Sequence, residues 1–339
     1  MPATLRSADR GDSDQRLCLP MTFTVLIPSY RRPDSLLHCL DSLLLGSRLP
    51  DEIVVVLRDL DEDSRRALDG WRATHPLPAG TNLRQTLADR PGQIVAMNCG
   101  LQAATGDVVC FTDDDCVPRP DWLERLSAHY GQDSVGGVGG RDLVHEEGTT
   151  LHGKVTEVGR LTWCGRLIGN HHLDYEGPAL RVDHLKGANM SFRRELLQPF
   201  DERMSGGSSC LNDTDASLHV TGQGFRLIYD PLAIVDHYPA QRFDTSTRVK
   251  TDPGLVYSDS HNWVYCMFKH LGPVRRWVFF AYAVLVGGGS RLGLGKWLWR
   301  LPREPREATR SLVAATRGKF AGLRTYRQSR GQVPVNQNR

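Results

Sequence analysis

The stretch DVVCFTDDDCVPRP, residues 107–120, carries the strongest indication of the fold. Its first half, DVVCFT, is apolar and rich in valine, which is typical of a buried strand. Three consecutive carboxylates, Asp113, Asp114 and Asp115, follow that strand directly. In open α/β sheets, ligands bind at the carboxyl ends of the parallel strands, and this acidic loop is expected to lie there.

Strand and helix patterns alternate on both sides of this stretch. Residues 22–28 (TFTVLIP) and 53–57 (IVVVL) predict strands, and IVVVL is apolar on both faces, as a central parallel strand should be. Helices are expected from Asp34 or Ser35 to residue 44, where leucines recur at helical spacing, and over 61–71, 93–104 and 120–130. This order predicts an α/β fold with an open, mostly parallel sheet flanked by helices.

The second half of the chain has a weaker pattern. Residues 131–185 are rich in glycine and predict no regular element. Residues 186–240 predict short strands and one helix near Asp213–Gly222, and beyond about residue 255 the pattern is helical and basic. No internal repeat is visible.

Charge is distributed unevenly along the 339 residues, which include 42 Lys and Arg and 39 Asp and Glu. Residues 260–339 hold 15 basic and 2 acidic residues, a net charge of +13, whereas residues 1–259 hold 27 basic and 37 acidic residues, a net charge of −10. With 40% hydrophobic residues the chain has ample material for a core, which excludes a disordered protein. The basic segment indicates an anionic partner, either a membrane surface or a nucleic acid.

The most apolar segment is WVFFAYAVLVGGGS, residues 277–290. Its 14 uncharged residues fall short of the roughly 20 that a membrane-spanning helix needs. Two interpretations stay open: a helix buried in a core, or an interfacial segment, which the tryptophans at 277, 297 and 299 would suit. Residues 1–20 have no apolar run, so we expect a loose N-terminal arm and not a signal peptide. Eight scattered cysteines without zinc spacing favour a reducing cytoplasm.

The three consecutive carboxylates predict a cation site. Side by side at the end of a buried strand they repel one another strongly unless a cation is present. Mg²⁺ and Mn²⁺ prefer such oxygen ligands and commonly join one or two carboxylates to the phosphates of a substrate. The alternative for an isolated acidic triplet is a solvated turn, but the preceding strand and the prolines at 118 and 120 favour the metal site.

Three shorter motifs are candidates for the same site. In PSYRRP (28–33) the tyrosine ring could stack on a nucleobase and an arginine could pair with phosphate, although the segment could also be an ordinary loop. In NDTD (212–215) we expect Asp215 to cap a helix, which leaves Asp213 as the better candidate for a general base. His237, within Asp-His-Tyr, could complete a metal site or could be structural.

Taken together these motifs resemble the family 2 glycosyltransferases, which have the GT-A fold. The matching segments occur in the family's order over roughly residues 22–240, and together they are highly specific. They are VLIPSYRRP (25–33), DEIVVV (51–56), AMNCGLQAATGDVVCFTDDDCVPRPDWL (96–123), LKGANMSFRREL (185–196), FDE (200–202), NDTDASLHVTGQGFRLIYDP (212–231) and VDH (235–237).

The resemblance implies a role for each matching residue. Asp113 and Asp115 correspond to the DXD motif, in which Asp115 holds Mn²⁺ or Mg²⁺ on the donor diphosphate, and Asp114 helps to bind the ribose or the donor sugar. Asp213 corresponds to the base that deprotonates the acceptor hydroxyl, and His237 to a further metal ligand of some members. The residues implied at the nucleotide and the donor sugar are Pro28, Tyr30, Arg32, Asp59, Asn98, Gly187 and Asn189.

The chain departs from the family pattern in places. Asp59 follows Leu57 and Arg58 where paired acids are usual, so the identity of the nucleobase stays open. Asn212 replaces the usual glutamate before the base, and AMN (96–98) replaces the usual ARN, which removes a cation near the phosphates. The QxxRW motif of processive synthases is absent, which favours transfer of a single sugar.

The implied function is inverting transfer of one sugar from a UDP-, GDP- or dTDP-sugar to a saccharide or lipid-linked acceptor, in cell-surface polysaccharide or glycolipid synthesis. We expect an arm (1–20), a nucleotide-sugar half (21–120), an acceptor and catalytic half (121–245), and a basic helical extension (246–339). The extension predicts a peripheral position on the inner face of the cell membrane and no binding of nucleic acid. The alternatives are a sugar-phosphate nucleotidyltransferase, whose glycine-rich phosphate loop is missing, and a nucleic-acid-binding protein that uses the basic extension.

Overall fold

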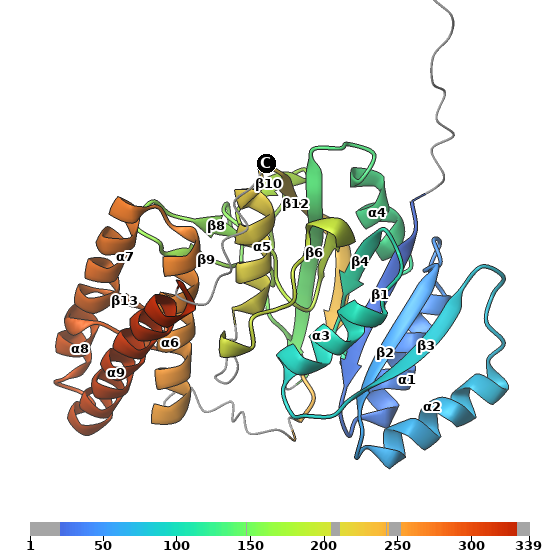
Figure 1. Ribbon diagram of the computed structural model, residues 1–339, viewed down its shortest axis with the longest axis horizontal. Helices are drawn as coiled ribbons and strands as arrows, with labels where there is room; N and C mark the ends of the chain where they lie inside the picture. The colour runs from blue at the N-terminus through green and yellow to red at the C-terminus, as the bar shows by residue number, and fades with distance from the viewer. Residues whose placement is uncertain (1–20, 147, 205–210, 242, 244–251, 331–339) are drawn as a thin grey trace, which may run out of the picture.

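A computed structural model describes residues 21–146, 148–204, 211–241, 243 and 252–330, and its centre is one mixed sheet (Figure 1). The strand order is β10-β12-β6-β11-β4-β1-β2-β3, with β5 beside β12 and β7 beside β6. These strands are β1 (Phe23–Ser29), β2 (Glu52–Arg58), β3 (Asn82–Ala88), β4 (Val108–Phe111), β5 (Cys116–Pro118), β6 (Val135–Glu146), β7 (Thr149–Thr150), β10 (Leu180–Val182), β11 (Met190–Arg193) and β12 (Arg226–His237). Two hairpins lie apart from this sheet, β8 (Arg160–Leu161) with β9 (Leu167–Ile168) and β13 (Gly287–Gly288) with β14 (Arg291–Leu292).

Helices cover both faces of the sheet. They are α1 (Pro33–Leu44), α2 (Glu62–Thr74), α3 (Gln93–Ala103), α4 (Trp122–His129), α5 (Asn212–Gly222), α6 (Pro253–His270), α7 (Pro273–Leu285), α8 (Leu294–Arg300) and α9 (Pro305–Arg330), with short 3₁₀ turns η1 (Arg194–Leu196) and η2 (Glu202–Met204). Alternate residues of β1 enter two different cores, Val25 and Ile27 beside α1 and Leu26 beside α3. A strand that is buried on both faces in this way is a continuous apolar run, which is the pattern of TFTVLIP and IVVVL.

The predicted α/β fold class is confirmed, and the first elements lie close to the expected residues. Parallel pairs join β1 to β2, β1 to β4 and β2 to β3. Sequence patterns did not predict β3, because its residues NLRQTLA alternate only weakly and several are exposed at the edge of the sheet. The N-terminal arm (1–20) lies outside the described residues.

The glycine-rich segment without a predicted element forms the long strand β6. Its glycines allow neighbouring chains to approach closely: a Cβ atom on Gly140 would lie 1.8 Å from the carbonyl oxygen of Ala233. The pairing of β6 with β12 is parallel and shifts register between Asp230 and Ile234. We call residues 231–233 the β12 bulge; after it, Val235 lies opposite Asp142.

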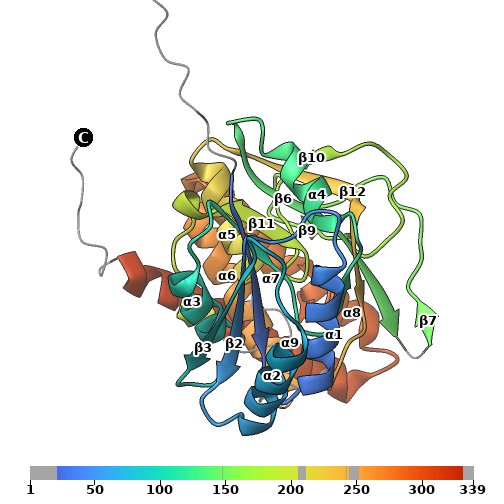
Figure 2. The same ribbon diagram turned by 90° about the vertical axis from the view of Figure 1, so that its right-hand side faces the viewer.

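The C-terminal helices form a separate layer next to α5, behind the sheet in the view of Figure 2. Helix α6 packs along α9, and Phe268 contacts Tyr326 edge to face with ring centroids 5.5 Å apart. The segment that could be a core helix or an interfacial one falls mostly in α7, of which only Phe279 and Ala283 are buried. In the part of the chain that the structure describes, no helix combines the length and apolarity needed to cross a bilayer.

Candidate active site

Polar side chains from several separate segments meet at the carboxyl edge of the sheet. Tyr30 and Arg32 follow β1, the three carboxylates 113–115 follow β4, and His237 ends β12. Because β1 and β4 are parallel neighbours, the loops after them share one edge. The antiparallel strand β5 joins this edge to β12, since Cys116 pairs with His237. The sheet therefore brings together residues that are more than 100 positions apart in the sequence.

Four of these residues form a group that could hold a metal ion. The potential ligand atoms of Asp113, Asp115, Cys116 and His237 all lie within 4.8 Å of one another. Burial, and after it the neighbouring Asp115, raises the pKa of Asp113. Two carboxylates and an imidazole this close have the chemistry of a Mg²⁺ or Mn²⁺ site, and a divalent cation would relieve the repulsion between the carboxylates. The donor set therefore fits the metal that the sequence predicts.

His237 is held between two carboxylates. Its Nδ1 donates to Asp142 Oδ1 over 2.9 Å, and its Nε2 lies 3.3 Å from Asp115 Oδ1. Burial acts to lower the pKa of His237, but the hydrogen bonds to Asp115 and Asp142 outweigh it and raise this pKa to about 10. Asp142 is fully buried on β6 and also pairs with Lys186. A carboxylate that fixes the ring in this way is the usual partner of a metal-binding histidine.

Arg32 neutralises the other side of the acidic loop. Its guanidinium lies 2.8 Å from Asp114 Oδ1 and 3.0 Å from Asp115 Oδ2. Asp114 is fully buried, and this burial raises its pKa to about 7, although Arg32 acts in the opposite direction. Arg32, the residue before α1, therefore lies against the acidic loop and compensates the charge of two of its carboxylates.

A flat aromatic surface lies beside this loop. The ring of Tyr30 lies near two guanidinium groups, those of Arg31 at 5.2 Å and Arg58 at 5.5 Å from its centroid. Arg58 Nε lies 3.6 Å from Asp59 Oδ1, a buried atom without a hydrogen-bond partner among the described residues. Tyr30 and Asp59, both expected at the nucleobase, are thus linked through Arg58. Pro28 lies near the end of β1, in register with Val56 of β2.

Asp61 fixes the loop that carries Tyr30 and Arg32. Arg31 has a left-handed backbone with φ of 55°, and its N–H donates to Asp61 Oδ2 over 2.6 Å. The other oxygen of Asp61 accepts from Ser64 N at 3.2 Å and so caps α2. Sequence reasoning had not singled out Asp61, Asp142 or Lys186 for the site. Asp142 is fully buried in β6, and charged residues are rarely fully buried without a partner. An aspartate among the apolar and glycine residues of this segment is the one feature of the sequence that could have pointed to its role.

Asp213 lies at the start of α5 and faces the loop before β11. Leu211, the residue before the helix, is left-handed with φ of 56°. Asp213 Oδ2 accepts from the N–H of Gly187 at 3.2 Å, and Oδ1 accepts from Thr214 N at 2.6 Å. The structure therefore brings together Asp213 and Gly187, two of the predicted site residues. Asn212 points elsewhere, because its amide contacts Met97 in the core.

Two residues that are predicted at the donor, Asn98 and Asn189, hydrogen-bond to other parts of the protein. Both ends of the Asn98 amide hydrogen-bond the backbone of Phe200. Asn189 is fully buried; its Oδ1 accepts from Trp122, and its Nδ2 donates to the carbonyls of Arg141 and Ala233. These hydrogen bonds fix both side chains in the fold around the site, and their contact with the donor stays a prediction.

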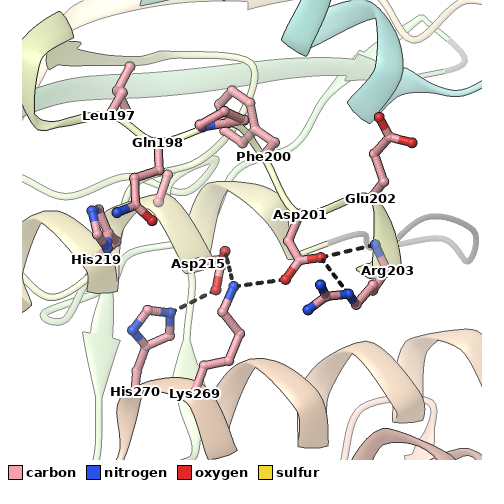
Figure 3. Close-up of a pocket in the computed structure, with 12 residues that line it drawn as sticks. Leu197, Gln198, Phe200, Asp201, Glu202, Arg203, Asp215, His219, Lys269 and His270 are labelled. Atoms are coloured by element: carbon pink, nitrogen blue, oxygen red, sulfur yellow. Dashed lines mark hydrogen bonds and ion pairs between the residues drawn. The ribbon is translucent and has the colours of Figure 1, made fainter. Parts of the chain in front are cut away.

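A polar pocket of about 390 Å³ lies on a different face of α5, against α6 (Figure 3). Asp215, expected as a helix cap, instead pairs with α6: its oxygens lie 2.7 Å from His270 Nε2 and 2.8 Å from Lys269 Nζ. Burial acts to raise the pKa of Asp215, but His270 and Lys269 outweigh it and hold this pKa below its usual range. Lys269 also reaches Asp201 at 3.2 Å. The pocket contains no predicted site residue, and its ion pairs join the catalytic region to the C-terminal helices.

The chain belongs to family 2 of the glycosyl transferases, because the family model "Glycosyl transferase family 2" matches residues 24–199, more than half of its length. It is therefore a transferase enzyme, and the nucleotidyltransferase alternative falls away. Pre-mycofactocin glycosyltransferase of Mycobacterium tuberculosis is 30% identical over 152 residues, which are 43% of this chain and 30% of that protein. O-antigen biosynthesis protein RfbC of Myxococcus xanthus is 25% identical over 258 residues, 71% of this chain and 19% of that protein. The chain thus spans less than a third of the length of these two relatives.

Solved structures show the same fold at low sequence identity. GalNAc-T7 with UDP, GalNAc and Mn²⁺ superposes with a TM-score of 0.58 at 18% identity, covering 79% of this chain and 51% of that one. TarS 1–349 of S. aureus in complex with UDP-GlcNAc superposes with a TM-score of 0.55 at 15% identity, covering 92% of both chains. These likenesses establish the GT-A fold.

Proposed function

We propose that this glycosyltransferase transfers one sugar, with inversion and with a divalent metal, from a nucleotide-sugar donor to an acceptor hydroxyl. The observation that carries the proposal is the group of Asp113, Asp115 and His237 at the carboxyl edge of the sheet. The Tyr30 surface lies on the β1 side of that group, and Asp213 lies at the start of α5. Metal, nucleobase and base would then occupy three neighbouring parts of one site.

Asp113, Asp115 and His237 would hold the metal, and Asp142 would keep the His237 ring in place. When bound, Mn²⁺ or Mg²⁺ would neutralise the negative charge that develops on the departing diphosphate. Arg32 holds Asp114 and Asp115 in place and thus shapes the diphosphate side of the site.

Asp213 would act as the general base. As the acceptor oxygen forms its bond to the anomeric carbon, the bond from that carbon to the diphosphate breaks, and the hydroxyl proton passes to Asp213. Attack from the face opposite the diphosphate inverts the configuration. The N–H of Gly187 holds one oxygen of Asp213 and so orients the carboxylate. Tyr30 and Asp59 would bind the nucleobase of a UDP-, GDP- or dTDP-sugar by stacking and hydrogen bonding.

The acceptor would be a saccharide or lipid-linked saccharide at the inner face of the cell membrane, in cell-surface polysaccharide or glycolipid synthesis. Among the relatives, RfbC and the succinoglycan biosynthesis protein ExoM of Rhizobium meliloti have names from such pathways; ExoM is 29% identical over 100 residues. The C-terminal helices add large exposed apolar side chains, including Trp277 (57% exposed), Trp299 (68%) and Phe320 (54%).

Basic residues accompany these apolar side chains. A pocket of about 530 Å³ along α9 is lined by Arg306, Arg310 and Arg317. Aromatic side chains next to arginines suit the headgroup region of an anionic bilayer, where each basic residue contributes about 1 kcal/mol of attraction. We therefore favour a membrane over nucleic acid as the partner of the +13 extension.

The test is a panel of UDP-, GDP- and dTDP-sugars, in which the release of nucleoside diphosphate is measured with Mg²⁺, with Mn²⁺ and with EDTA. We expect one nucleotide class to be hydrolysed slowly with metal and not with EDTA. Binding by calorimetry of the same nucleotide in Asp115→Asn would provide the matched control. Equal binding of all three nucleotides with and without metal would contradict the proposal.

A further inference from the structure

Cys116 is part of the group at the carboxyl edge of the sheet, but the proposed donor site makes no use of its thiol. It is the first residue of β5 and follows the three carboxylates directly. Its N–H donates to the carbonyl oxygen of Asp113 over 3.2 Å, which closes a tight turn around Asp114 and Asp115. In the antiparallel pair of β5 and β12, Cys116 lies opposite His237. Residues opposite each other in such a pair have their side chains on the same face, so the thiol lies beside the His237 ring.

Two of the four potential ligands in this group have no other partner. Among the described residues, neither the Asp113 carboxylate nor the Cys116 thiol has a hydrogen bond or an ion pair. His237 uses Nδ1 for Asp142 and keeps Nε2 on the side of Asp115. The potential ligand atoms of the four residues all lie within 4.8 Å of one another. Two carboxylate oxygens, one imidazole nitrogen and one sulfur make up the ligand number and the ligand types of a tetrahedral zinc site.

A second group of aspartate, cysteine and histidine provides a contrast. The potential ligand atoms of Asp215, Cys266 and His270 also lie within 4.8 Å of one another. Lys269 Nζ lies 2.8 Å from one oxygen of Asp215, and His270 Nε2 lies 2.7 Å from the other. This carboxylate is therefore compensated without an ion. In the described part of the chain, Asp113 has no basic side chain within ion-pair distance, so its charge is left for a cation to compensate.

We propose that Cys116 makes the carboxyl-edge group a closed site for a soft divalent cation such as Zn²⁺, and that an ion bound there excludes the donor. The inference rests on the proposed function, in which Asp113, Asp115 and His237 hold Mn²⁺ or Mg²⁺ on the donor diphosphate. Thiolate ligands select Zn²⁺ over the hard cation Mg²⁺. The Cys116 thiol releases its proton to the solvent as its sulfur binds the cation. With four protein ligands, a tetrahedral cation has no position left for a phosphate oxygen.

The thiol thus gives the two kinds of cation different effects on the donor. With Mg²⁺ or Mn²⁺, the Cys116 thiol stays protonated, and the diphosphate completes the set of ligands. With Zn²⁺, the thiolate takes the place of the diphosphate. Mn²⁺ and a nucleoside diphosphate should therefore bind together, whereas Zn²⁺ and the nucleoside diphosphate should compete.

The first experiment uses Co²⁺, which accepts the tetrahedral ligand sets of Zn²⁺ and absorbs in the near ultraviolet when a thiolate binds it. Co²⁺ is titrated into the metal-free full chain of the wild type, Cys116→Ala, Cys116→Ser and the matched control Cys266→Ala. We expect this absorption in the wild type and in Cys266→Ala, and its loss in both Cys116 variants. Calorimetry should show Zn²⁺ binding at least about tenfold weaker in the Cys116 variants, since the loss of even a supporting partner lowers metal affinity by about that factor.

The second experiment tests the exclusion of the donor. Calorimetry measures the binding of the nucleoside diphosphate found in the donor panel, with Mn²⁺ alone and with Mn²⁺ plus an equal concentration of Zn²⁺. We expect Zn²⁺ to weaken this binding in the wild type and in Cys266→Ala, and to weaken it less in Cys116→Ala.

A wild type whose Co²⁺ complex lacks the thiolate absorption would overturn the proposal, and this result does not depend on how any variant folds. The proposal would also be overturned if the absorption persisted in both Cys116 variants, or if Zn²⁺ left nucleotide binding by the wild type unchanged. A wild type that does not bind the nucleoside diphosphate with Mn²⁺ would instead contradict the proposed function, so the two failures are distinct.

Discussion

Asp142 holds His237 through a single hydrogen bond of 2.9 Å, from Nδ1 to Oδ1, although 95 residues separate them in the chain. The other ring nitrogen faces Asp115, so this contact orients the side chain that is proposed as a metal ligand. In the proposed metal site Asp142 is therefore a positioning residue for His237, and its replacement should lower the affinity for metal.

Replacing Asp142 with Asn should weaken the binding of Mn²⁺ in the presence of nucleoside diphosphate by about 10- to 100-fold, as losses of such supporting carboxylates do elsewhere. Calorimetry measures the affinity. The matched control is Asp236→Asn, next to His237 on β12, whose carboxylate pairs with Arg119 at 2.8 Å and with His145 at 2.8 Å instead. Equal metal affinity in the wild type and Asp142→Asn would show that the contact does not position the ring for metal.

Replacing Asp213 with Asn should lower the rate of sugar transfer by about 10²- to 10⁴-fold, the contribution typical of a general base. Donor binding should stay unchanged, because Asp213 contacts Gly187 and Thr214 but none of the described metal-site residues. Steady-state rates and calorimetry with the donor nucleotide measure the two effects. A variant that transfers sugar at the wild-type rate would exclude Asp213 as the base.

Replacing Arg32 with Met should destabilise the protein more at pH 8 than at pH 6, because the pKa of the fully buried Asp114 is about 7 and only its ionised form loses a compensating charge. The double variant Arg32→Met with Asp114→Asn should recover much of that loss. Urea denaturation measures the free energy of unfolding in all four members of the cycle. If the second substitution recovers nothing, Arg32 does not act through Asp114.

The ion pairs between Asp215 and α6 should appear in the pH dependence of stability. The pKa of Asp215 is below its usual value in the folded protein, so its contribution is present at neutral pH and is lost as the pH falls below about 4. Both proteins should lose stability between pH 6 and pH 3. The wild type should lose about 1 to 3 kcal/mol more than Asp215→Asn, because only the wild type has the carboxylate that becomes protonated. The titratable groups that face Asp215 include Lys269, His270 and the Cys266 thiol, and Lys269 also contacts Asp201. Parallel curves for the two proteins would contradict this account.

The double variant Trp277→Ser with Trp299→Ser should bind vesicles of phosphatidylglycerol more weakly than the wild type, by about tenfold, since two large exposed aromatic side chains are lost. Co-sedimentation measures the bound fraction, and vesicles of phosphatidylcholine test the need for negative charge. Leu45→Ser is the control, because Leu45 is 75% exposed but lies after α1 in the catalytic region. If all three proteins bind to the same extent, α7 and α8 do not contribute to membrane binding.

The parts of the site that consist of short sequence motifs could be predicted from the local sequence. The acidic loop follows its strand directly, so its place at the carboxyl edge could be predicted without any long-range contact. His237 and Asp213 could be singled out as candidates from their motifs, but their neighbours could not. The contacts of Asp142 and Asp61 depend on the register between strands and on a left-handed residue in a loop, and neither leaves a periodic pattern in the sequence.

Asn98 and Asn189 show what a matching motif does not predict. Asn98 and Asn189 lie in segments that match the family, and the resemblance placed them at the donor. In the structure their amides hydrogen-bond to backbone groups, and their contact with the donor stays a prediction. A matching segment therefore identifies a region of the site, whereas the hydrogen bonds decide whether a given side chain faces the ligand.

The β12 bulge makes the metal site sensitive to chain length. Side chains alternate between the two faces of a strand, so a shift of one residue exchanges the faces. Residues 231–233 absorb the offset that the close contact of Gly140 with Ala233 imposes, and His237 comes only four residues later. A substitution in the bulge would alter packing, but the deletion of one residue would turn His237 away from Asp115 and bring Tyr238 to its position. At this point of the chain, spacing matters more than residue type.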